Sequence, residues 1–186
     1  NLVVPIVINP SPVNIARTIR DDGFAIIAPD GHIIRKYSLT EILMDNGYRA
    51  VLMGIGCCEW DLIHLNDAQP VLRDIGGARV GDIALSSRHL SSVMLYRPLT
   101  NKIIWLKTGP WINQHDINQM DNGNYSVFGN DMYRVCPDVV KADTISDIYI
   151  YNPADNSVVT PYASVLKQVG MYTPFSGRSR ILNNGD

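Results

Sequence analysis

Two histidines lie in short runs where strand alternation would decide which way each side chain points. His64 and Asn66 are two positions apart, so in a β-strand they share one face while Asp67 points to the other. An imidazole beside a carboxamide can form part of an active site, or it can be a buried ring whose nitrogens are satisfied by hydrogen bonds. Taken alone, the pattern favours the buried ring and leaves the active-site interpretation open.

The second histidine follows the same rule. In residues 114–116 the outer two side chains share a face, and His115 takes the other. Asp116 is therefore not expected to orient His115; we expect it to bind backbone groups at the strand edge. His64 and Asp67, like His115 and Asp116, are ligand types on opposite faces, so they form no tetrahedral set. The sequence predicts no metal site here.

Arg88 and His89 are neighbours, so in a strand at most one of them faces a site. Arg88 shares its face with Ser86 and is the better candidate for substrate binding, while His89 is expected to pack or to lie on the surface. Trp111 has the shape to stack on an aromatic substrate, although large aromatic side chains more often belong to a core. His32 lies beside a turn and is expected to be solvated.

The composition limits the classes of partner. The chain has 186 residues, 46% of them hydrophobic, and a net charge of -2, which is typical of a globular domain. Its 16 basic and 18 acidic residues are interspersed, so neither a nucleic acid nor an anionic membrane is expected as partner. No apolar run reaches the roughly 18 residues of a membrane span. Three cysteines without metal-type spacing predict neither a disulfide framework nor a structural metal site. Cys57 and Cys58 are expected to be free thiols, with a vicinal disulfide between them as the alternative.

Strand signals dominate the chain. Turn residues at 29–31 separate two β-rich runs and predict a hairpin, and helical periodicity is confined to residues 39–44 and 163–168. The expected strands are residues 24–28, 32–37, 49–55, 67–72, 82–87, 92–97, 102–107, 115–120, 125–129, 147–151 and 157–160.

Two segments repeat the same plan. VMLYRPLTNKIIW, from Val93, and IYIYNPADNSVVT, from Ile148, both read strand, aromatic, proline, turn asparagine and strand. A four-stranded unit recurring every 40 to 50 residues or so is typical of a β-propeller blade. We predict an all-β fold with under about a fifth helix, in which residues 1–186 form a single partial propeller domain of about four blades. The last turn lacks a returning strand, so remaining blades or another chain are expected to close the ring.

Four motifs follow one another between residues 63 and 131. They are HLND at 64–67, LSSRHLSSVMLYRP at 85–98, IIWLKTGP at 103–110 and QHDINQMDNGNYSVFGND at 114–131. As an ordered set they resemble the arylsulfotransferase family. The resemblance implies a six-bladed propeller that moves sulfate from an aryl sulfate to a phenol through a sulfohistidine, with neither a nucleotide sulfate donor nor a cofactor. It also favours an exported protein.

The resemblance implies roles for particular residues. His64 and His115 match two histidines of the family's central channel, and Arg134, nineteen residues after His115, matches its sulfate-holding arginine. These three are the implied catalytic residues, because NH and cationic donors must surround the sulfuryl oxygens and the departing phenolate. The implied substrate-binding residues are Asn66, Arg88 and Trp111.

One feature departs from the family. The histidine that becomes sulfated in characterised members lies on a later blade, and none of the four histidines of this chain follows His115. The nucleophile is therefore expected to lie beyond Asp186, to be replaced or to be absent. An alternative is therefore a propeller that keeps the fold as a non-catalytic binding or structural module. Metal-dependent chemistry is the third interpretation.

Overall fold

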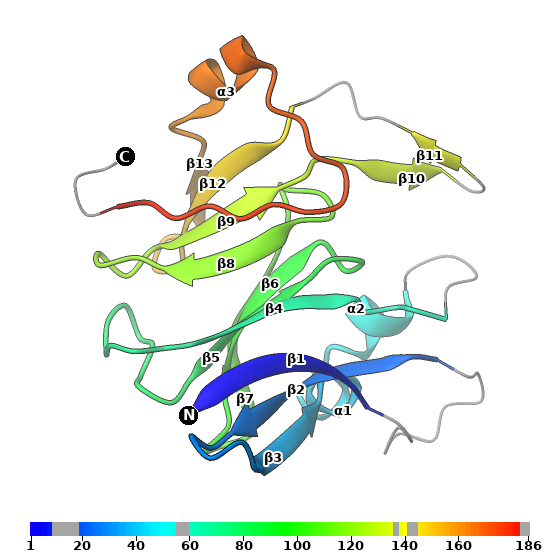
Figure 1. The fold of residues 1–186 in the computed structure, drawn as a ribbon, viewed down its shortest axis with the longest axis vertical. Helices are drawn as coiled ribbons and strands as arrows, with labels where there is room; N and C mark the ends of the chain where they lie inside the picture. The colour runs from blue at the N-terminus through cyan, green and yellow to red at the C-terminus, as the bar shows by residue number, and fades with distance from the viewer. Residues whose placement is uncertain (9–18, 55–59, 136–137, 141–144, 183–186) are drawn as a thin grey trace.

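The computed structural model describes residues 1–8, 19–54, 60–135, 138–140 and 145–182. Three antiparallel sheets are stacked one beside the next, as Figure 1 shows from the blue to the orange end of the chain. The first sheet, in the order β1-β2-β3, contains β1 (Leu2–Ile8), β2 (Asp21–Ile27) and β3 (Ile33–Ser38). The predicted hairpin over residues 24–37 is thus confirmed.

Each of the other two sheets has four strands. The second contains β4 (Leu65–Pro70), β5 (Ile83–Ser87), β6 (Ser92–Arg97) and β7 (Lys102–Thr108), in chain order. The third, in the order β13-β12-β9-β8, contains β8 (His115–Gln119), β9 (Tyr125–Gly129), β12 (Asp147–Asn152) and β13 (Ser157–Val159). A separate hairpin joins β10 (Tyr133–Val135) to β11 (Asp138–Val140). The sheets are consistent with propeller blades, and the described residues form three of them rather than about four.

The repeated turn is visible in the backbone. Asn101, between β6 and β7, and Asn156, between β12 and β13, have positive φ angles of 52° and 62°. Asparagine adopts this left-handed conformation more readily than most residues, which explains why it recurs at the same position of both hairpins. The internal repeat read from Val93 and Ile148 therefore corresponds to equivalent structure.

Helices are short and accessory. α1 (Leu39–Asp45) begins at Ser38, whose side chain accepts a hydrogen bond from Glu41 N at 3.0 Å, and α3 is Ala163–Val169; both were predicted. α2 (Arg49–Met53) occupies the run predicted as a strand, so that prediction is wrong. Arg, Ala, Leu and Met are strong helix formers, and burial of Leu52 in the core with α1 holds the turn in place. No helix in the described ranges is long and apolar enough to cross a membrane.

Both faces of the second sheet are buried. One face shares a core with the first sheet and α1, through residues such as Phe24, Leu39 and Leu85. The other shares a core with the third sheet, through Val93, Trp111 and other residues. This explains why β5 and β6 are almost continuously apolar or small, since a strand covered on both faces does not alternate.

Side chains join neighbouring sheets near their inner strands. β4 lies beside both β1 and β8 (Figure 1). The carboxylate of Asp22 accepts a hydrogen bond from Leu65 N at 2.9 Å, and that of Asp67 accepts one from Ile117 N at 3.0 Å. Both acids are buried. Backbone groups at the sheet junctions are therefore satisfied by aspartates of the preceding sheet.

A first prediction concerns this junction. Asp67→Ala should lower the free energy of unfolding by about 2 kcal/mol or more, because it leaves the buried N–H of Ile117 without its acceptor. Urea denaturation measures the change. The control is Asp121→Ala, which removes an exposed ion pair with Arg73 and should cost less than about 1 kcal/mol. Equal effects of the two substitutions would contradict the role given to Asp67.

Candidate functional site

The two predicted channel histidines lie at the same end of neighbouring strands. His64 immediately precedes β4, and His115 is the first residue of β8. The strands run in the same direction, since early residues of β4 meet early residues of β8: Asn66 Nδ2 donates to Gln114 O at 2.7 Å. The structure thus brings His64, Asn66 and His115 to one region, although Asn66 itself is engaged with the backbone of the neighbouring sheet.

The backbone at His64 departs from a regular strand. Its φ is 50°, and the pairing of β4 with β5 shifts register between Leu65 and Asp67. Alternation therefore does not decide where the His64 side chain points, which corrects the sequence argument. Two contacts with Asp61 set the orientation of the His64 side chain. One carboxylate oxygen is 2.6 Å from His64 Nδ1, and the other accepts a hydrogen bond from His64 N at 3.2 Å.

Arg88 and His89 do not face opposite ways. They lie in the turn after β5, where strand alternation has ended, and Arg88 Nη1 is 2.9 Å from His89 Nε2. His89 Nδ1 is 2.6 Å from Asp61 O, and its ring centroid is 4.5 Å from that of His64. His89, expected to pack or lie on the surface, therefore belongs to the cluster. The serine-rich run around it is a turn signal that identifies where the strand ends.

His115 is held by a carboxamide. Its Nδ1 is 2.6 Å from Asn130 Oδ1, while Asn130 Nδ2 donates to Thr173 O at 2.6 Å and Ser176 O at 2.9 Å. Two carbonyl acceptors fix the carboxamide, so its oxygen faces the ring and His115 Nδ1 carries the proton. The neutral ring then has a lone pair on Nε2.

Burial and a neighbouring charge lower the pKa of His115. Burial acts first, and Arg88 and the neighbouring His64 lower that pKa further, against the opposing hydrogen bond to Asn130. These residues lie at the same end of the inner strands: Arg88 N donates to His64 O at 3.0 Å, and Gln114 Nε2 donates to Ser87 O at 3.0 Å. Asn130, which sequence reasoning did not single out, is the residue that orients His115.

The other two predicted residues lie elsewhere or outside the described part. Trp111 is 1% exposed and packs against Tyr149 and Tyr151 in the core between the second and third sheets. A substrate has no access to its ring in this structure, so Trp111 is a core residue rather than a substrate contact. Arg134 lies in β10 opposite Val139, and its side chain lies outside the described residues, as do all three cysteines.

Asp61, His64 and His89 form the group in the described residues that could hold a metal ion, with ligand atoms within 4.8 Å of one another. Hydrogen bonds already engage these atoms. Arg20 Nη1 also lies 3.3 Å from Asp61 Oδ2. Arg20 Nε lies 2.8 Å from Asp22 Oδ1 as well, so a guanidinium group already balances the carboxylate that a cation would need. Asp67 and Asp116, the acids weighed from the sequence, instead accept from backbone N–H groups of Ile117 and Ser179.

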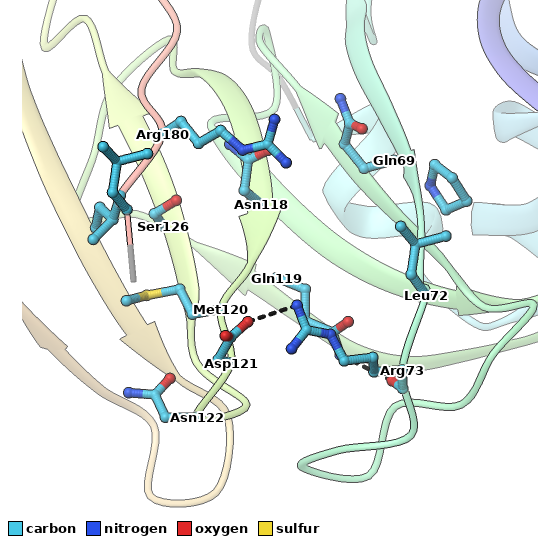
Figure 2. Close-up of a pocket in the computed structure, with 13 residues that line it drawn as sticks. Gln69, Leu72, Arg73, Asn118, Gln119, Met120, Asp121, Asn122, Ser126 and Arg180 are labelled. Atoms are coloured by element: carbon cyan, nitrogen blue, oxygen red, sulfur yellow. Dashed lines mark hydrogen bonds and ion pairs between the residues drawn. The ribbon is translucent and has the colours of Figure 1, made fainter. Parts of the chain in front are cut away.

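A separate cleft of about 470 Å³ lies at the opposite ends of β4 and β8. Figure 2 shows Gln69, Asn118 and Arg180 around it, together with the ion pair between Arg73 and Asp121. None of the predicted site residues lines this cleft. The histidine cluster and the cleft are therefore distinct features at the two ends of the inner strands.

The chain matches the family model described as Arylsulfotransferase (ASST) over residues 3–186. No curated protein matches the chain, and neither does any solved structure. The match extends well beyond the four motifs and includes all three sheets.

A second prediction concerns the charge of His115. Its ring should titrate with a midpoint below the ordinary value of 6.5, because burial and nearby positive charge disfavour the imidazolium. Arg88→Gln removes one of these charges and should raise the midpoint. Nuclear magnetic resonance of the histidine ring protons measures both, with Arg35→Gln in β3 as the matched control. A midpoint above 6.5 in the unaltered protein, or one that Arg88→Gln leaves in place, would contradict the prediction.

Proposed function

Because the chain belongs to the arylsulfotransferase family, we propose that it transfers sulfate from a small aryl sulfate to a phenolic acceptor at the cluster of His64, His115 and Arg88. One observation supports the proposal: His64, Arg88 and His115 lie at the same end of the inner strands, where Arg88 N donates to His64 O at 3.0 Å and Gln114 Nε2 donates to Ser87 O at 3.0 Å. Arg134 is proposed as a further sulfate-holding residue from its place in the motif.

The chemistry fits the needs of sulfuryl transfer. A sulfuryl group carries three oxygens that gain stabilisation from NH and cationic donors, and its transfer through a histidine requires a neutral ring. The lowered pKa of His115, caused first by burial, supplies such a ring near neutral pH. No nucleotide sulfate donor and no cofactor are part of the proposal.

A further proposal concerns the segments that complete the propeller ring and the compartment of the protein. The chain beyond α3 runs beside β8 (Figure 1), where Ser179 N donates to Asp116 and Asn118 Nδ2 donates to Ser179 O. This is the position of the inner strand of a following blade. We therefore propose that further blades or another chain complete the ring, and, from the family alone, that the protein is exported.

The second candidate is a propeller that binds ligands or serves as a structural module without catalysis. The feature that supports it is confined to residues 1–186, in which no histidine follows His115. In that case the cluster would hold a sulfate-like anion without forming or breaking a bond to sulfur.

A third prediction separates these candidates. With a chromogenic aryl sulfate and a phenol, His115→Ala and Arg134→Ala should each lower turnover about 100-fold or more, as loss of a transition-state donor typically does. His32→Ala, an exposed ring in the β2–β3 hairpin, is the matched control and should keep full turnover. A chelator should have no effect. An unaltered protein that binds the aryl sulfate without cleaving it would favour the non-catalytic module, and loss of turnover with chelator would favour metal chemistry.

A further inference from the structure

Asp61 contacts His64 twice. One carboxylate oxygen is 2.6 Å from His64 Nδ1, and the other accepts a hydrogen bond from His64 N at 3.2 Å. The Asp61 side chain is 9% exposed and that of His64 is 36% exposed, so the carboxylate is buried beneath a half-buried ring. An ionised carboxylate can only accept hydrogen bonds, which means that His64 Nδ1 carries the proton.

The surroundings keep Asp61 ionised. Burial alone would raise its pKa, but the hydrogen bond from His64, the neighbouring rings of His64 and His89 and the charge of Arg20 hold that pKa below its usual value. Arg20 also pairs with Asp22 at 2.8 Å, so the guanidinium group spans the two acids. Asp61 therefore remains an acceptor near neutral pH.

The ring of His64 is fixed from several directions. Its backbone is held in the left-handed region at φ 50°, and its ring packs against His89 at 4.5 Å between centroids. His89 contacts Asp61 O through Nδ1 and Arg88 Nη1 through Nε2, so its own ring is held on both sides. With Nδ1–H bound to Asp61, Nε2 of His64 carries the lone pair of the ring, and the side chain is 36% exposed.

We propose that Asp61 is a positioning residue that holds His64 in the Nδ1–H tautomer, so that Nε2 is ready to accept the proton of the phenolic acceptor. The role in proton transfer rests on the proposed function. In that step the phenolic O–H bond breaks and its proton forms a bond to His64 Nε2. The phenolic oxygen forms the new bond to sulfur, and the bond from sulfur to the histidine nitrogen that carries it breaks, with its electron pair staying on that nitrogen. The imidazolium that results is stabilised by the Asp61 carboxylate, as in other aspartate–histidine pairs.

The tautomer can be measured without any substrate. In protein labelled with ¹⁵N histidine at alkaline pH, long-range ¹H–¹⁵N correlations should show His64 protonated on Nδ1. Asp61→Asn keeps the shape but offers an NH₂ group in place of one oxygen, so it should shift His64 towards the Nε2–H tautomer. The matched control is Asp82→Asn, which alters another buried carboxylate, paired with Arg97 away from the cluster, and should leave His64 unchanged.

Kinetics provide the second measurement. Asp61→Asn should lower kcat for aryl sulfate turnover by about 100-fold or more with little change in KM, because a wrong tautomer affects the proton transfer rather than binding. Asp82→Asn should leave kcat within a few-fold.

The outcomes are distinct. An unaltered protein whose His64 carries its proton on Nε2 overturns the proposal, even if Asp61→Asn fails to fold. The proposal is also overturned if Asp61→Asn changes neither tautomer nor kcat. If the tautomers behave as expected but the unaltered protein turns over no aryl sulfate, the positioning role of Asp61 stands and the proposed function fails.

Discussion

Buried carboxylates that accept backbone N–H groups across the sheet junctions are the constraint on which the structure depends. Asp22 accepts from Leu65, Asp67 from Ile117, and Asp116 from Ser179. Among the described residues no β-ladder joins one four-stranded sheet to the next, so the bonds of Asp22 and Asp67 help to fix the position of each inner strand along its neighbour. The burial has a cost, because it raises the pKa of both Asp22 and Asp116. The hydrogen bonds and the arginines beside these two acids offset part of that cost.

The junction bonds explain why two histidines far apart in sequence meet. With Asp67 bound to the backbone of β8 and Asn66 bound to Gln114 O, the first residues of β4 and β8 are brought to the same end of the stack. Left-handed residues then turn the chain at this end, among them His64 and Asp116 with φ of 50° and 62°. Regular strands supply the scaffold, and irregular backbone at their first residues directs the polar side chains.

The sequence predicted most of the scaffold because local signals are strong there. Turn residues bounded the strands of the second and third sheets to within two residues or so, and the repeated asparagine marked equivalent turns. The sequence-based predictions were wrong or incomplete where contacts between distant parts of the chain determine the structure. The run from Arg49 forms a helix because its apolar side chain Leu52 joins the core with α1. His89 and Asp61 were missed as site residues because alternation says nothing about a turn, and because a carboxylate three residues before a histidine meets it only when the backbone bends.

His64 and His115 form hydrogen bonds with different partners, and this difference has chemical consequences. His115 is bound to the neutral carboxamide of Asn130, and its pKa is lowered by burial and by nearby positive charge. His64 is bound to the carboxylate of Asp61, which accepts from Nδ1 and leaves the lone pair of a neutral ring on Nε2. Two chemically identical side chains thus differ in the group that fixes them: a carboxamide held by two backbone carbonyls for His115, and a buried carboxylate for His64. In both, the hydrogen bond at Nδ1 sets the tautomer, so the partner of each ring decides which nitrogen carries the lone pair.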